Sequence, residues 1–137
     1  MLNLVRVLLF SSLIFVAAAK AEWVEYFNAN NQVSTVTYST SSIRRADESH
    51  YSVTIFTNYK MMQSSELNKR KVQFQSKSET QIFGCEGQDF ALGDYELYQA
   101  RDALGLKTTV TQKELIWNPI APGTLQMDLL HKFCATR

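Results

Sequence analysis

Residues 124–134 read TLQMDLLHKFC, the clearest helical pattern of the chain and the segment that decides its fold. Leu125, Leu129 and Phe133 recur at every fourth position, and their side chains would form an apolar stripe along one side of a helix. The threonine that opens the segment belongs to the residue types that cap a helix. A stripe of this kind needs an apolar surface to pack on, and the segment ends on Cys134.

The chain before this segment is dominated by β patterns that can supply that surface. Aromatic, β-branched and threonine-rich stretches alternate with polar ones, which is typical of strands. The predicted strands are Trp23–Phe27, Gln32–Tyr38, Tyr51–Thr57, Lys71–Phe83, Asp89–Tyr98 and Lys107–Trp117. We therefore predict an α+β fold, with a single antiparallel β-sheet of about six strands and the C-terminal α-helix packed on one face.

The long run Lys71–Phe83 predicts a strand with one polar, solvent-exposed side, which we call its wet side. Val72, Phe74 and Ile82 share one parity, and charged and amide side chains occupy the other, which is typical of a one-sided antiparallel strand. Cys85 has the parity of the wet side. We therefore predict a β-bulge at Gly84 that turns Cys85 toward the core.

The remaining segments predict turns, loops and bends. Gly93 lies between two apolar pairs of opposite parity and predicts a bend within its strand. The predicted connections are a tight turn at Asn28–Asn31, a loop or single helical turn at Ser39–Asp47, a polar connection at Met61–Asn68, and an irregular stretch at Asn118–Gly123 that contains both prolines.

The first 21 residues have the layout of a secretory signal peptide. One basic residue, Arg6, precedes the largely apolar run Val7–Ala19, and small residues follow at the positions that a signal peptidase reads. The alternative is an uncleaved membrane anchor, but a spanning helix needs roughly 20 apolar residues. We expect residues 1–21 to be a signal peptide cleaved after Ala21, and residues 22–137 to form one exported domain.

The two cysteines, Cys85 and Cys134, predict a disulfide. An even cysteine count in an exported chain is typical of a bridge, and one between positions 49 apart is worth roughly 4 kcal/mol on the chain-entropy model. The alternative is a reactive thiol at Cys134, activated by His131 three residues earlier. The oxidising compartment favours the disulfide, which would link the helix to the sheet.

Charge and composition argue against several kinds of partner. The first 21 residues hold two of the 14 basic residues and none of the 13 acidic ones, and residues 22–137 therefore carry a net charge of −1. This balance gives no attraction to nucleic acid. No cysteine ends the apolar run, and we expect no lipid or other membrane anchor after cleavage.

Order and spacing of several short segments make the chain similar to a known family. The segments are Trp23, Tyr38-x-x-x-Ser42-Ile43-Arg44, Phe56–Lys60, Ser76-Lys77-Ser78 leading to Cys85, Trp117–Thr124, and the helix with Cys134. In these the chain resembles the surface-adhesin protein E-like domain family of small exported bacterial proteins, over Trp23–Cys134. The resemblance implies an antiparallel sheet with a disulfide-linked C-terminal helix, and attachment to host surface or matrix proteins.

Two sets of side chains are candidates for an interaction surface. Lys69, Arg70 and Lys71 form the only basic triplet, which could bind an acidic partner or be a solvated strand edge. Most aromatic residues have strand spacing and are expected in the core, but Tyr59, Tyr95 and Tyr98 lie near strand ends and are the better interface candidates.

We find no pattern for a metal, a cofactor or catalysis. The two histidines, His50 and His131, are 81 positions apart, and a metal site needs three or four converging ligands. No spaced nucleophile motif or phosphate-binding glycine cluster is present. We expect a binding module rather than an enzyme, with no cofactor and no metal.

The sequence leaves two non-enzymatic functions open. The first is a binding module that engages a matrix or envelope protein, or a second copy of itself as a homodimer, through a sheet face or edge strand. The second is a soluble structural protein of the envelope with no adhesive role. We expect a periplasmic protein, with the cell surface or secretion as alternatives.

Overall fold

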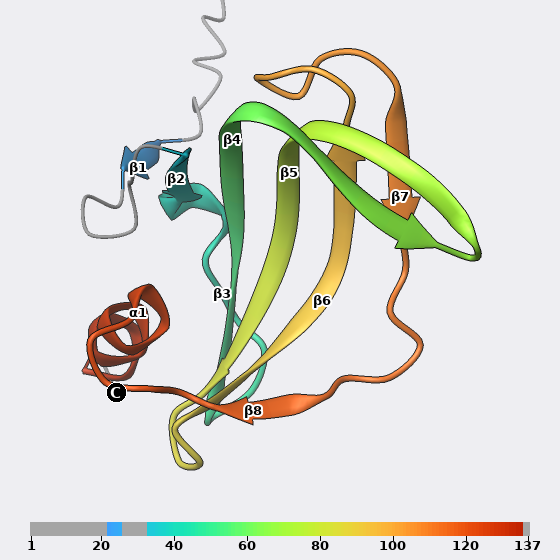
Figure 1. Ribbon diagram of the computed structural model, residues 1–137. Coiled ribbons are helices and arrows are strands. Elements are labelled where there is room, and N and C mark those ends of the chain that lie inside the picture. The colour runs from blue at the N-terminus through green and yellow to red at the C-terminus, as the bar shows by residue number, and fades with distance from the viewer. Residues whose placement is uncertain (1–21, 26–32, 136–137) are drawn as a thin grey trace, which may run out of the picture.

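The computed structural model describes residues 22–25 and 33–135. The predicted signal peptide, residues 1–21, and the predicted turn at Asn28–Asn31 lie outside the described residues. The described part forms strands, one 3-10 turn and one α-helix (Figure 1). In chain order these are β1 (Trp23–Glu25), β2 (Ser34–Ser39), η1 (Thr40–Ser42), β3 (Arg44–Arg45), β4 (His50–Leu67), β5 (Arg70–Gly84), β6 (Asp89–Tyr98), β7 (Lys107–Val110), β8 (Trp117–Pro119) and α1 (Leu125–Cys134).

All the strands belong to one antiparallel sheet. The order across it is β1-β2-β4-β5-β6-β7, with β3 paired to β4 and β8 paired to β6. Figure 1 shows α1 beside the lower half of this sheet and the far end of the β4–β5 hairpin bending away from it. The predicted α+β fold is therefore confirmed. The described part of the chain has eight strands rather than about six, because β3 and β8 are two- and three-residue segments without a strand pattern.

The helix packs on one face of the sheet, which we call the helix face. Tyr51, Val53 and Ile55 of β4 point to it and are buried, as their shared parity predicts. Directly opposed residues of antiparallel strands share a face, and Phe83, opposite Tyr51, is therefore also on the helix face. The apolar stripe of α1 completes this core: Leu125, Leu129, Leu130 and Phe133 are all buried in the same cluster.

The other side of the sheet, which we call the far face, is less covered. Phe56 of β4 points to it and is half-buried under the ring of Trp23, with ring centroids 6.0 Å apart. Phe56 interrupts the polar alternation of its strand, and β4 is accordingly covered on both sides.

A β-bulge in β6 explains why its apolar residues change parity. Glu79 of β5 opposes Tyr95 and Gln81 opposes Leu92, which leaves one extra residue on β6 at Gly93. An extra residue rotates the following side chains to the opposite side of the strand. Phe90 and Leu92 before the bulge, and Tyr95 and Leu97 after it, therefore all point to the helix face. The bend predicted at Gly93 is this bulge.

The predicted sides of β5 are wrong near its end. Gln81 and Phe83 point to the helix face and are 3 % and 0 % exposed, whereas Ile82 points to the far face opposite Ser52. The side that carries the charged and amide residues is the one that α1 covers. The prediction assumed that apolar residues mark the side of the core. This assumption fails for Ile82 because both faces of the sheet are partly covered, and an apolar side chain can therefore lie on either face.

The predicted bulge at Gly84 is also wrong. Gly84 pairs in regular register with His50 on one side and Asp89 on the other. Cys85 has the same parity as Phe83 and is already on the side of the helix. It needs no rotation to reach Cys134.

The predicted disulfide is confirmed. Cys85 and Cys134 are bonded, with their Cα atoms 5.7 Å apart, and the bridge links the end of α1 to the end of β5. The backbone N–H of Cys85 donates to the carbonyl of Ser49 at 2.8 Å, which ties this end of β5 to the start of β4. A free reactive thiol at Cys134 is therefore wrong, because both sulfurs are used.

The β4–β5 hairpin is longer than predicted. Met61–Asn68 is not a connection, because β4 continues to Leu67 after an irregular register between Asn58 and Gln63. The turn itself is Asn68–Lys69, and both residues have positive φ, as a type I′ hairpin turn requires. Polar residues dominate this stretch, and the strand is held by its pairing with β5 rather than by an apolar side.

The last predicted strand is split in two. Lys107–Val110 forms β7, residues 111–116 have no regular structure, and Trp117–Pro119 forms β8 at the other end of β6. The irregular stretch Asn118–Gly123 was predicted to begin one residue after Trp117, but Asn118 and Pro119 belong to β8. Proline is tolerated there because β8 pairs with only one of the described strands, β6.

The helix follows its sequence pattern. It begins at Leu125, and the side-chain oxygen of Thr124 accepts a hydrogen bond from the N–H of Met127 at 3.3 Å.

The loop predicted at Ser39–Asp47 contains the short turn η1 and the two-residue strand β3. In the part of the chain that the structure describes, no helix is both long and apolar enough to cross a membrane.

Candidate interaction surfaces

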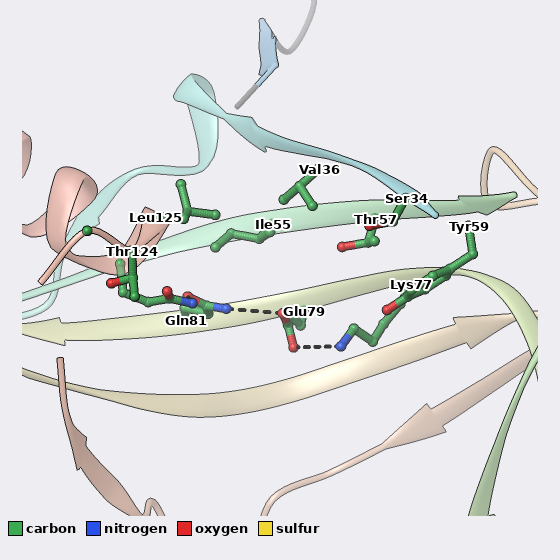
Figure 2. A pocket seen from close by; sticks show the side chains of 12 residues that line it. Ser34, Val36, Ile55, Thr57, Tyr59, Lys77, Glu79, Gln81, Thr124 and Leu125 are labelled. Atoms are coloured by element: carbon green, nitrogen blue, oxygen red, sulfur yellow. Dashed lines mark hydrogen bonds and ion pairs between the residues drawn. The ribbon is translucent and has the colours of Figure 1, made fainter. Parts of the chain in front are cut away.

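The helix leaves part of the helix face open as a hollow. It lies between β2, β4, β5 and the first residues of α1, and its volume is about 430 Å³ (Figure 2). We call it the helix-face hollow. Its lining residues are Ser34, Val36, Ile55, Thr57, Tyr59, Lys77, Glu79, Gln81, Gly123, Thr124, Leu125 and Gln126.

A chain of polar side chains crosses the helix-face hollow. Lys77 Nζ lies 3.3 Å from Glu79 Oε2, and Gln81 Nε2 donates to Glu79 Oε1 at 3.1 Å. Gln126 of α1 donates to Gln81 at 3.5 Å. The side chains of Lys77 and Glu79 are only 25 % and 11 % exposed, and this ion pair is therefore less screened than one on an open surface. Figure 2 shows the three β5 side chains in a row along the strand.

Two of the three candidate tyrosines lie at this polar row. Tyr59 lines the helix-face hollow and contacts Phe74 edge-on, with ring centroids 5.7 Å apart. Tyr95 opposes Glu79 across the β5–β6 ladder and lines an adjoining hollow of about 280 Å³ that shares Lys77 and Glu79. The structure therefore brings Tyr59 and Tyr95 to the same side of the sheet, around one ion pair.

The third candidate, Tyr98, lies on the far face. It lines a separate hollow of about 480 Å³ together with Trp23 and Phe56. Its hydroxyl donates a short hydrogen bond to the carboxylate of Glu96. This hydrogen bond, with smaller contributions from burial and the negative charge of Glu96, raises the pKa of Tyr98 to about 12.

The basic triplet lies at the end of the β4–β5 hairpin. Lys69 is in the turn, Arg70 and Lys71 open β5, and all three are exposed. Lys71 lines a shallow hollow of about 340 Å³ with Leu106, which places this arm next to the β6–β7 loop. The triplet is a charged hairpin end and forms no ion pair with the described residues.

The histidines do not form a catalytic or metal cluster with the described residues. His50 Nδ1 lies 2.7 Å from Asp47 Oδ1 in an exposed pair, and the ring of His50 contacts Trp117. The pKa of Asp47 is lowered, first by the backbone N–H of Ser49 and then by the hydrogen bond with His50. His131 is exposed on α1. In residues 22–25 and 33–135, no three His, Cys, Asp or Glu side chains converge to hold a metal.

Sequence reasoning missed the row Lys77, Glu79 and Gln81 as part of a site. Their alternation was visible, but it was taken as the wet side of a one-sided strand. The signal available was Cys85, which shares their parity and had to reach the helix. Extending that parity back along the run would have placed all three residues on the helix face.

Comparison with solved structures shows the same fold in a known protein. A structure of Haemophilus influenzae protein E superposes with a TM-score of 0.55 at 14 % sequence identity, covering 74 % of this chain and 80 % of that one. Its selenomethionine form gives 0.58 at 14 % identity, covering 82 % and 85 %. Protein E from non-typeable Haemophilus influenzae gives 0.57 at 13 % identity, covering 83 % and 84 %. At sequence identities of 13–14 %, the structural likeness shows that the fold is shared and nothing more.

Family membership rests on the sequence itself. No curated protein sequence matches the chain. The family model described as surface-adhesin protein E, however, matches residues 23–135, from the first strand to the residue after the bridged Cys134. This span includes the described strands and the helix. The chain therefore belongs to the surface-adhesin protein E family.

Proposed function

We propose that this chain is an exported, non-enzymatic module that binds a protein partner of the host matrix or of the bacterial envelope. The match to the surface-adhesin protein E family over residues 23–135 carries the proposal. The fold, shared with protein E of Haemophilus influenzae, supports it. Export follows from the predicted signal peptide, cleaved after Ala21.

The helix face is the proposed binding surface. Tyr59 and Tyr95 supply aromatic contact area on the two sides of the Lys77–Glu79 pair. Tyrosine is among the residue types that are enriched at interface hot spots. The basic hairpin end, Lys69–Lys71, would contribute mainly to the association rate, because exposed charges steer encounter more than they add affinity.

The test is a binding assay with purified residues 22–137 in the oxidised form. The protein is titrated over immobilised extracellular-matrix proteins and over separated envelope proteins, and the signal is followed to saturation. For a partner that binds, we expect Tyr59→Ala with Tyr95→Ala to weaken affinity at least tenfold, about 1.4 kcal/mol. Met61→Ala is the control, because it truncates an exposed side chain that lines neither the helix-face hollow nor the hollow around Tyr98.

Two results would overturn this proposal. Absence of saturable binding to every purified protein would remove the binding function. Binding that is insensitive to the double change at Tyr59 and Tyr95 would place the interface elsewhere on the molecule.

A structural envelope protein without adhesive function is the second candidate. The predicted cleavage after Ala21 would leave Glu22, rather than a lipid-carrying cysteine, as the first residue. Protease shaving of intact cells, with an epitope tag after Arg137, separates the two. Digestion from outside supports the adhesive function, whereas protection followed by release on osmotic shock supports a periplasmic one.

A further inference from the structure

The hollow on the far face has a different chemistry from the helix-face hollow. We call it the far-face hollow, and it is formed by β1, β2, β4, β5, the end of β6 and the loop after it. Its lining residues are Trp23, Thr37, Thr54, Phe56, Asn58, Ser78, Tyr98, Asp102 and Ala103. A volume of about 480 Å³ lies within the usual range for a small-molecule or side-chain site.

Three aromatic rings line the far-face hollow. Trp23 is 46 % exposed and meets Phe56 edge-on, with ring centroids 6.0 Å apart. Tyr98 of β6 lies on the same face, two strands from Phe56 of β4. Its hydroxyl is already donated to Glu96, and the phenol stays neutral through the physiological range. Electron-rich aromatic faces attract cations, and a planar guanidinium also stacks on them.

A fixed carboxylate completes the hollow. Asn58 Nδ2 donates to Asp102 Oδ1 at 2.8 Å, and the backbone N–H of Asp102 donates to Asn58 Oδ1 at 2.8 Å. This pair of hydrogen bonds joins positions 44 apart and fixes the orientation of the Asp102 side chain. Asp102 Oδ2 accepts no hydrogen bond from residues 22–25 or 33–135 and remains available to a ligand.

The loop that presents Asp102 is itself anchored. Ser76, which is 0 % exposed, donates to the carbonyl of Ala100 at 2.6 Å and accepts from the N–H of Ala103 at 3.1 Å. Asp102 and Ala103 both have left-handed backbone conformations, with φ of 59° and 58°. For alanine this conformation is strained, and it persists here because the hydrogen bonds on both sides hold the loop.

The charges around the far-face hollow favour a cationic ligand. Its lining includes one carboxylate and no basic side chain. Lys107, opposite Tyr98 on β7, is ion-paired with Glu96 at 3.6 Å. Arg101, next to Asp102 in the chain, is exposed and does not line the hollow.

We propose that the far-face hollow binds an arginine side chain of a protein partner, with the guanidinium stacked on the Trp23–Phe56 rings and hydrogen-bonded to Asp102. That the arginine belongs to a protein partner rests on the proposed function, but the ability of the hollow to bind a guanidinium group does not. Arginine fits better than lysine because its planar group can stack and donate to a carboxylate at the same time. The hydroxyls of Thr54 and Ser78 can accept its remaining N–H groups.

The experiment is a fluorescence titration of a Trp117→Phe variant of residues 22–137, in which Trp23 is the only tryptophan. The probes are N-acetyl-arginine amide, N-acetyl-citrulline amide, which has the same shape without the charge, and N-acetyl-lysine amide. We expect saturable quenching by the arginine probe, with a dissociation constant on the order of 1 mM. We expect citrulline and lysine to bind at least tenfold more weakly.

Two variants make the assignment specific. Asp102→Asn should abolish arginine binding, and Glu114→Gln, which removes the same charge from an exposed residue outside the hollow, should leave it unchanged. Calorimetric titration of the unmodified protein gives the same comparison if Trp117→Phe does not fold. Equal binding of arginine and citrulline, a preference for lysine, or arginine binding that survives Asp102→Asn would overturn the site.

The site and the proposed function can fail separately. Partner binding that persists with Asp102→Asn, together with no response to the arginine probe, would disprove the site and leave the function intact. Binding of the arginine probe, with no protein bound in the preceding assay, would leave the site and disprove the function.

Discussion

At the scale of residues, the disulfide between Cys85 and Cys134 is the clearest determinant of this structure. Cys85 directly follows β5 and Cys134 ends α1, and both cysteines pack against the core cluster that contains Phe133. It therefore restricts the unfolded chain and holds the last turn of the helix against the sheet. Both effects are lost together when the bond is removed.

Replacing Cys134 by serine should destabilise the domain strongly. Loss of a closed loop between positions 49 apart costs about 4 kcal/mol, which for a domain of this size lowers the melting temperature by about 10–20 °C. Thermal unfolding in non-reducing buffer measures the change in melting temperature. Reduced wild-type protein is the control and should melt with the variant. An unchanged melting curve would contradict the stabilising function of the bridge.

Tyr98 should make stability sensitive to alkaline pH. Its pKa is raised from 10.0 in a free side chain to about 12, and the folded state therefore favours the protonated phenol. The resulting stabilisation is complete below pH 10 and is lost as pH rises from about 10 to about 12. Absorbance titration should show one tyrosine ionising near pH 12 in the wild type, a step that Tyr98→Phe removes.

The variant Glu96→Gln tests what raises the pKa of Tyr98. The first cause of the shift is the hydrogen bond from Tyr98 to the carboxylate of Glu96. With an amide in its place, the pKa of Tyr98 should fall toward 10. A late titration step that remains in Glu96→Gln would mean that burial alone raises the pKa.

At the scale of elements, the helix and the strands differ in how their sequences encode them. The bounds of α1 follow from a capping threonine and a repeating apolar stripe, both local signals. The hairpin of β4 and β5 extends through Met61–Leu67, where no apolar side exists, because each strand supplies the hydrogen-bond partners of the other. That pairing is not visible in either strand alone.

Thr124→Ala should weaken the helix by about 1 kcal/mol. The variant loses the side-chain oxygen that accepts from the N–H of Met127, while the apolar stripe of the helix is unchanged. Thr124→Ser keeps an oxygen at this position and is the control. Denaturant unfolding of the three proteins measures the difference, and equal midpoints for alanine and serine would show that the cap contributes nothing.

The bulge in β6 shows how a local irregularity controls a whole face. One extra residue at Gly93 moves Tyr95 and Leu97 to the side of Phe90 and Leu92. A Cβ atom at Gly93 would lie 3.3 Å from the carbonyl oxygen of Thr80, a tighter contact than most Cβ atoms make. The bulge is what places Tyr95 beside the Lys77–Glu79 pair.

At the scale of the whole molecule, α1 and the sheet share a core within the described part of the chain. The helix covers only part of the helix face, and the uncovered part is the helix-face hollow. The far face is partly covered by Trp23 and by the loop that carries Asp102. Each face therefore keeps an open hollow next to a packed region.

Amide hydrogen exchange should reveal how firmly the helix is docked. In the oxidised protein we expect the amides of Leu129–Phe133 to be as protected as those of Val53–Ile55, because both segments are buried in the same cluster. After reduction, the helix should exchange at least tenfold faster than the strand. Equal protection in the reduced protein would show that packing alone holds the helix.

The sequence by itself determined the features that depend on neighbouring residues. The bounds and cap of α1, the inward side of Tyr51–Ile55, the disulfide and the α+β class follow from local periodicity, capping chemistry and cysteine count. A signal peptide at residues 1–21 stays a prediction from the same kind of pattern. Family membership could be recognised because the order of short segments along the chain is itself a sequence property.

Only the tertiary structure decided which side of β5 the helix covers and which candidate residues meet. Gln81 and Phe83 face the helix, and Ile82 does not, because the register with β4 fixes the side chains of β5 relative to the core. Tyr59 and Tyr95 come together, whereas Tyr98 joins Trp23 and Asp102 on the other face. Strand order, register and the bulge at Gly93 set these neighbours, and each depends on contacts between residues far apart in the chain.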